Sequence, residues 1–136
     1  MDYQKIKDFR NNRSRFAQRL GIVVEQVGSG YARAVKTITE EDLNPLDRAH
    51  GGVLFAVADT ACGSAAASYG YQSVTLNASY SFLWGGSAGD VVTAEAKEIK
   101  HGKTVSVYEA LVTNQNGRLL GSATMTFYTL DKPLDL

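Results

Sequence analysis

Hydrophobic and polar residues alternate in the second half of the chain, between short segments rich in Gly and Asn. Val74, Leu76, Ala78, Tyr80 and Phe82 alternate with polar residues, which is the period of a strand that buries one face. Residues 105–112 repeat this period. Turn-forming segments separate four strand-like runs, at 74–82, 91–99, 105–112 and 119–130. We therefore predict four antiparallel strands here, in a meander-like arrangement.

The first half of the chain has a different pattern. Apolar residues at helical spacing predict one short amphipathic helix within residues 1–20, with a buried stripe formed by Ile6, Phe9, Phe16 and Leu20. The apolar runs 22–27 and 31–38 flank Gly28-Ser29-Gly30 and predict a β-hairpin. Residues 39–48 are acidic, contain Asn44-Pro45 and predict a loop.

Residues 51–69 form the least polar segment of the chain. Between Gly52 and Tyr69 there is one charged residue, Asp59, and no proline. A helix without a polar face is expected to be buried all round, and its many small residues let other backbone approach closely. The segment is too short and too polar in its second half to span a membrane. We predict an α+β architecture in one domain, residues 1–136, with an antiparallel sheet curled around this central helix.

The composition of the chain argues against several classes of function. The chain has 14 basic and 14 acidic residues, and this neutral balance argues against a general nucleic-acid binder or a membrane-surface protein. The single cysteine, Cys62, excludes an internal disulfide and suits a reducing compartment. The polar first residues do not resemble a signal peptide, so we expect a cytoplasmic protein. With two His and one Cys, we expect neither a metal nor another cofactor.

Asp59 is the first candidate for chemistry. Burying an ionised carboxylate without a partner costs several kcal/mol or more. No Lys or Arg occurs between Arg48 and Lys97, so no neighbour in the sequence can pair with Asp59. Because perturbed acids cluster at active sites, we interpret Asp59 as catalytic. The structural alternative is an aspartate solvated at a helix end or bonded to backbone.

His50-Gly51-Gly52 forms the start of the same helix. Its free amide groups and the positive end of the helix dipole can stabilise a developing oxyanion. Glycine also lets a substrate carbonyl approach the backbone closely. His50 either adds a further donor or serves only to cap and pack the helix.

The spacing of these two features carries a geometric consequence. Gly51 and Asp59 are eight residues apart, which is about 12 Å along a helix axis. A base and an oxyanion donor both have to lie about 3 Å from the reacting centre. If both serve one site, Asp59 of one subunit must face Gly51 of another across a two-fold axis. We therefore predict an obligate dimer if the protein is an enzyme.

The segment from Asn44 to Ala61, NPLDRAHGGVLFAVADTA, resembles the signature of hotdog-fold thioesterases of the PaaI-like (phenylacetate thioesterase) branch. Weaker similarities lie in the following strand and in the last two hairpins, so that the resemblance runs from about Gly21 to Leu130. One departure is Trp84-Gly85-Gly86, where the family commonly has a proline. At this point the shape of the acyl pocket does not carry over.

The resemblance implies a helix wrapped by an antiparallel sheet, dimers often paired into tetramers, and hydrolysis of acyl-CoA thioesters with an aromatic or a short- to medium-chain acyl group. Asp59 would be the general base or the nucleophile, and the Gly51 amide would polarise the carbonyl, helped by His50 or Asn44. The further roles implied are water orientation by Thr75, CoA contacts by Lys103 and Thr104, water or CoA contact by Asn77, and substrate binding by Gly52 and Phe82.

Two other functions remain open on the same scaffold. A hydratase or dehydratase would need a catalytic His with an acid, and His50 is available for that role. A non-catalytic acyl-CoA binding module would need no buried acid, so Asp59 argues against it. Cys62 is a conceivable thiol nucleophile, but without a His or Asn partner we interpret it as a core residue.

Overall fold

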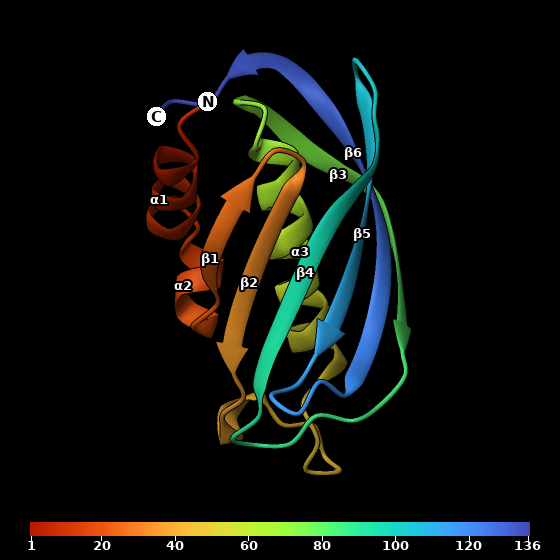
Figure 1. The fold of residues 1–136 in the computed structure, drawn as a ribbon. Helices are drawn as coiled ribbons and strands as arrows, with labels where there is room; N and C mark the ends of the chain where they lie inside the picture. Colours follow the sequence, from red (N-terminus) through yellow and green to blue (C-terminus); the bar gives the residue numbers. More distant parts are fainter.

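The computed structural model describes all 136 residues, with one six-stranded antiparallel sheet curled around helix α3 (Figure 1). The elements in chain order are α1 (Tyr3–Arg13), α2 (Arg15–Leu20), β1 (Val23–Gly28), β2 (Tyr31–Thr37), a short 3₁₀ helix (Glu40–Asp42), α3 (Gly51–Ala67), β3 (Tyr71–Phe82), β4 (Val91–His101), β5 (Val105–Thr113) and β6 (Leu119–Pro133). This confirms the predicted α+β architecture and the central helix. None of the helices combines the length and apolar character needed to cross a bilayer.

The order of strands across the sheet is β1-β2-β4-β5-β6-β3. β4, β5 and β6 are consecutive neighbours, but the prediction of a four-strand meander is wrong for β3. The chain crosses from the end of β3 to β4, which pairs with β2, while β3 itself pairs with the far side of β6 (Figure 1). β3 is therefore an edge strand with one row of unpaired backbone groups.

The prediction of a single helix within residues 1–20 is also wrong. Ser14 has extended backbone angles, and its hydroxyl accepts a hydrogen bond from the Ala17 amide at 3.4 Å. A serine in this position ends one helix and caps the next. The break rotates the second helix, so that Ile6 and Ala17 enter the core whereas Phe16 is 57% exposed.

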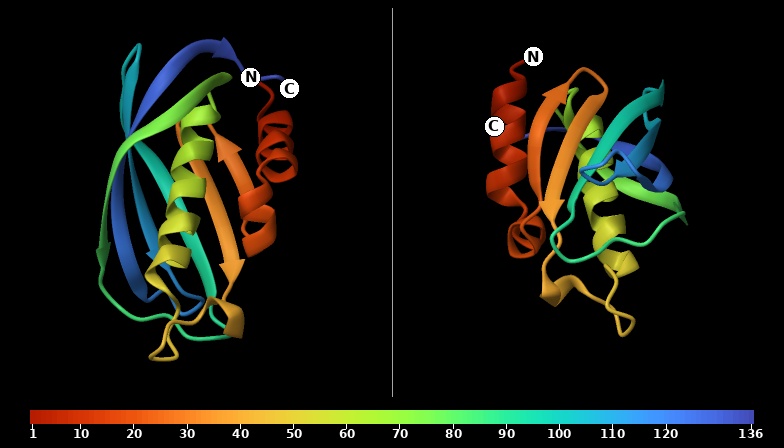
Figure 2. Two further views of the ribbon diagram at one scale, coloured as in Figure 1. Left: turned by 180° about the vertical axis from the view of Figure 1, so that it is seen from behind. Right: turned by 60° about the horizontal axis from the view of Figure 1, so that its bottom comes forward.

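One face of α3 remains partly uncovered, contrary to the prediction of burial all round. The concave sheet covers the opposite face, and no other element lies over this one in the left view of Figure 2. The uncovered stripe consists of residues three, four and seven positions apart, namely Gly52, Phe55, Asp59 and Ala66. The sequence of α3 is apolar on all sides and predicts that protein covers both of its faces. Within the single chain, the sheet covers only one face.

A bulge also breaks the alternation predicted for β3. The pairing of β3 with β6 shifts between Thr75 and Asn77, and both Thr75 and Tyr80 then contact residues of α3. An unbroken strand cannot turn an odd and an even position to the same face, so the bulge brings Thr75 toward the helix. Val74 and Leu76, predicted to be inward-facing, are 49% and 55% exposed.

Candidate active site

Asp59 lies midway along α3 on the uncovered stripe. The Thr75 hydroxyl donates a hydrogen bond to Asp59 Oδ1 at 3.3 Å, across the space between α3 and β3. Burial raises the pKa of the Asp59 carboxyl, and this effect outweighs the opposing effects of the Thr75 bond and the charge of Arg10. A carboxylate with a raised pKa is a better proton acceptor than an ordinary aspartate, as a general base requires.

Arg10 of α1 is a residue that the sequence reasoning missed. The sequence places no basic residue near Asp59, but the fold brings the Arg10 guanidinium against α3 beside Gly63, where it bonds to Ser64. A signal for this contact was present in the sequence, because Arg10 follows the buried Ile6 by four residues. Residues at that spacing share a helix face.

The first turn of α3 is capped by His50. Its Nδ1 accepts from the Gly52 amide at 2.8 Å, and its carbonyl accepts from Val53 and Leu54 at 3.0 and 3.4 Å. With Nδ1 as the acceptor of this bond, Nε2 is the ring nitrogen that is left to donate. The Gly51 amide has no such partner, so it is the unpaired donor of the first turn.

A cavity of about 430 Å³ opens beside the Gly51 end of α3. Gly51 and Phe82 are in close contact here, since a Cβ on residue 51 would lie 2.9 Å from the Phe82 ring. Asn44 lines the same cavity, and its Oδ1 accepts from the Leu46 and Arg48 amides at 2.9 and 3.1 Å. Trp84, at the departure from the family pattern, forms part of the wall.

A second cavity, of about 670 Å³, lies at the other end of α3. Lys103 and Thr104 line it from the β4–β5 turn. The rings of Tyr69 and His101 stack in its wall with centroids 3.8 Å apart. The cavity thus combines the Lys103 cation with flat aromatic surface, and Asp131 also lines it.

The thioesterase superfamily pattern matches residues 47–120 of the chain. Acyl-coenzyme A thioesterase PaaI of Escherichia coli K12 is 38% identical over 99 residues, which cover 73% of this chain and 71% of that protein. The chain belongs to the thioesterase superfamily. The structure of the E. coli PaaI protein from the phenylacetic acid degradation operon covers 93% of this thioesterase and 96% of its own chain, with a TM-score of 0.86 and 30% identity. A hypothetical thioesterase from Streptococcus pneumoniae TIGR4, solved with coenzyme A, covers 83% of this chain and 91% of its own, with a TM-score of 0.79 and 30% identity. The predicted hotdog fold and PaaI-like thioester hydrolase are confirmed.

The fold of this thioesterase divides the predicted site residues into three groups. Asp59 and Thr75 touch each other at the middle of α3, and Lys103 and Thr104 share the second cavity. The third group surrounds the start of α3, with Asn44, His50, Gly51, Gly52 and Phe82. Asn77 is exposed on β3, outside all three groups. Because α3 is unbroken from Gly51 to Ala67, the first and third groups stay apart within one chain.

Cys62 lies within the hydrophobic core. It is fully buried, and burial raises the pKa of its thiol to about 12. A thiol that remains protonated at neutral pH is a poor nucleophile. The interpretation of Cys62 as a packing residue is confirmed.

Proposed function

We propose that this thioesterase hydrolyses acyl-CoA to a free acid and CoA at two sites, each shared between the subunits of a dimer. One observation carries the proposal: α3 bears a carboxylate and an unpaired amide donor, and its unbroken length separates them. The acyl-CoA thioesterase named among the relatives and the coenzyme A in a similar structure support the substrate class.

The chemistry follows from the two groups. Asp59 takes a proton from a water molecule that Thr75 helps to orient, and the water attacks the thioester carbonyl. Direct attack by the Asp59 carboxylate is the alternative, with hydrolysis of the resulting anhydride in a second step. In either route the carbonyl oxygen becomes an oxyanion at the Gly51 amide, with His50 Nε2–H or Asn44 as further donors. The C–S bond then breaks, and CoA leaves as the thiolate, which takes up a proton.

The uncovered surface of the chain supports dimerisation. Six exposed large hydrophobic residues lie on β3 and the segment after it, namely Tyr71, Val74, Leu76, Phe82, Leu83 and Trp84. They follow the free edge of β3, and Phe82 among them lies against Gly51 at the start of α3. An edge strand with this much apolar surface is expected to be covered by another chain. A second copy related by a two-fold axis would bring each Asp59 toward the Gly51 end of the other α3.

The two cavities suggest how an acyl-CoA would be divided. The apolar wall beside Gly51, formed by Phe82, Leu83 and Trp84, suits an aromatic or a short- to medium-chain acyl group. Lys103 and Thr104 suit the phosphate groups of CoA, since a Lys ammonium binds phosphate as a point charge. Pairing of such dimers into tetramers is a further part of the proposal.

The geometry favours hydrolysis over hydration. A hydratase needs a His oriented by an acid, whereas the His50 ring bonds to the Gly52 amide and to no carboxylate. The test is release of free thiol from phenylacetyl-, hydroxybenzoyl- and hexanoyl-CoA by the wild-type protein. Thiol release from at least one of them is expected. Its absence, with water addition to an enoyl-CoA instead, would support the hydratase, and binding without either reaction would support the binding module.

A further inference from the structure

The Arg10 guanidinium lies beside Gly63, which follows Asp59 by four residues and so shares its face of α3. Its Nε donates to Ser64 Oγ at 2.9 Å, and its Nη2 lies 3.5 Å from the Thr60 carbonyl. Ser64 in turn donates to the same Thr60 carbonyl at 2.7 Å. Thr60 follows Asp59 directly, so the guanidinium is bonded to the turn of helix that carries the carboxylate.

Gly63 provides the space for this side chain. A Cβ on residue 63 would lie 2.7 Å from Arg10 Nη2, closer than such atoms approach in proteins. Glycine is a poor residue for a helix interior because its backbone loses more freedom on folding than that of other residues. At this position a glycine is explained by the close approach of the Arg10 guanidinium and not by the packing of apolar residues.

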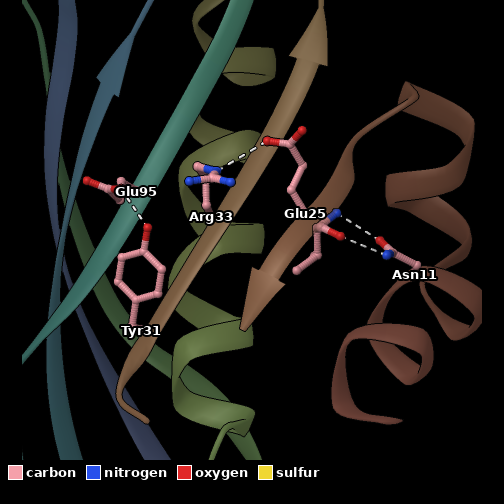
Figure 3. A network of polar contacts seen from close by, with 6 residues as sticks. Asn11, Glu25, Tyr31, Arg33 and Glu95 are labelled. Carbon is pink, nitrogen blue, oxygen red and sulfur yellow. Dashed lines mark hydrogen bonds and ion pairs between the residues drawn. The ribbon is translucent and has the colours of Figure 1, made fainter. Parts of the chain in front are cut away.

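A second contact fixes the position of α1. Asn11, next to Arg10, bonds twice to the backbone of Val24 on the edge strand β1 (Figure 3). Its Nδ2 donates to the Val24 carbonyl at 2.9 Å, and its Oδ1 accepts from the Val24 amide at 2.8 Å. α1 is therefore held against the sheet, and this fixes the point from which the Arg10 side chain extends to α3.

The charge of Arg10 is not neutralised by a direct ion pair. The three ion pairs of the chain involve other residues, and the nearest partners of the guanidinium are the neutral Ser64 and Thr60. Burial lowers the pKa of Arg10, and the charge of Asp59 opposes this effect. Around Asp59, Thr75 is neutral and Cys62 remains a thiol with a pKa of about 12. Arg10 is thus the cation that acts on Asp59.

We propose that Arg10 is a positioning residue for the reaction: its guanidinium, held by Ser64 and Thr60 in the space left by Gly63, keeps Asp59 ionised. The inference rests on the proposed role of Asp59 as base. A partly buried carboxylate without this cation would hold its proton to higher pH, and below that pH it could not accept one from water. The N-terminal helix thereby contributes to the site without touching substrate.

The first test is a double-mutant cycle that needs no turnover. The midpoint of urea unfolding at pH 8 is measured for wild type, Arg10→Met, Asp59→Asn and the double variant. We expect Arg10→Met to lower the midpoint more in the wild-type background than in the Asp59→Asn background, because only the former contains the carboxylate. Equal losses in the two backgrounds would overturn the inference. Arg13→Met, an exposed arginine of the same helix, is the control and should give equal losses.

The second test is the pH profile of kcat/KM for thiol release. In Arg10→Met the acid limb should move to higher pH, with about three- to tenfold more activity lost at pH 5.5 than at pH 8.5. Arg10→Lys, which keeps the charge, should recover most of the activity at pH 5.5. Gly63→Ala keeps Arg10 but displaces it, and should move the limb in the same direction as Arg10→Met. An unmoved limb in both Arg10→Met and Gly63→Ala would contradict the inference. A protein that releases no thiol at all would overturn the proposed function instead, and the unfolding cycle would still decide on Arg10.

Discussion

The substitution Asp59→Asn tests the assigned base most simply. Asparagine has the same shape, and its amide oxygen still accepts the 3.3 Å hydrogen bond from Thr75. The side chain loses only its charge and its ability to take a proton. General-base catalysis contributes about 10²–10⁴-fold to rate, which corresponds to roughly 2.7–5.5 kcal/mol of transition-state stabilisation. We expect kcat/KM to fall by that factor, and an attacking carboxylate would make the loss at least as large.

The same substitution should not weaken the fold. Burial raises the pKa of Asp59 above its value in the unfolded chain, so the ionised carboxylate destabilises the folded state at neutral and alkaline pH. This destabilisation is absent below the unfolded pKa, where the carboxyl is protonated in both states. Asp59→Asn should therefore raise the midpoint of thermal unfolding at pH 8, and the gain should disappear toward pH 3.

The assay is steady-state thiol release, with gel filtration to compare the assembly of the two proteins. Thr75→Val is the matched companion, since it removes the hydrogen bond to Asp59 but leaves the carboxylate. We expect it to lose less activity than Asp59→Asn and to shift the acid limb of the pH profile upward. Retention of more than about a tenth of wild-type kcat/KM by Asp59→Asn would refute the role of Asp59 as base.

Four further predictions concern other parts of the molecule. Gly51→Pro removes the unpaired amide but keeps the helix start and should lower kcat about 10²–10³-fold, whereas Gly51→Ala, which crowds Phe82 but keeps the amide, should lose much less. Lys103→Ala should raise KM for acyl-CoA and leave kcat almost unchanged, and a fall in kcat alone would contradict a CoA contact. Asp42 is paired with the buried Lys36 at 2.9 Å, and hydrogen bonds from Thr39 and Lys36 lower its pKa despite the opposing effect of burial. Asp42→Asn should therefore cost roughly 3–5 kcal/mol in urea unfolding at pH 7, with the difference from wild type lost as pH falls through the folded-state pKa of Asp42. Cys62→Ala should retain wild-type kcat, as a substantial loss would mean that the thiol takes part.

The central helix could be predicted because its sequence differs so strongly from that of a surface helix. In a small domain, a helix with one charge and many small residues is expected at the centre, packed against the sheet. Asp59 is conspicuous as its one charged residue. The roles of His50 and Gly51 at the helix start could also be predicted, because the chemistry of a helix start depends on residues close in sequence. The hydrogen bonds of the cap span only residues 50–54.

The features that the sequence did not reveal depend on contacts between distant segments. The bulge in β3 is set by its pairing with β6, so the alternation of Val74 and Leu76 gave no warning of it. The contact of Arg10 with Ser64 joins positions 54 residues apart. The exposed stripe of α3 contradicts the prediction of full burial only within one chain, because the apolar sequence has the composition of a helix covered on both sides. Composition predicts that both faces of the helix are covered, but it does not distinguish cover by the same chain from cover by a second chain.

The shared site is tested most directly by complementation between two inactive variants. Asp59→Asn chains lack the base and Gly51→Pro chains lack the oxyanion donor. In a mixed dimer, one of the two shared sites contains both intact groups and the other contains neither. Random mixing by joint refolding or co-expression should therefore restore about a quarter of wild-type activity per chain. If mixing restores no activity while tagged chains show that mixed dimers have formed, Asp59 and Gly51 do not act together across the subunits.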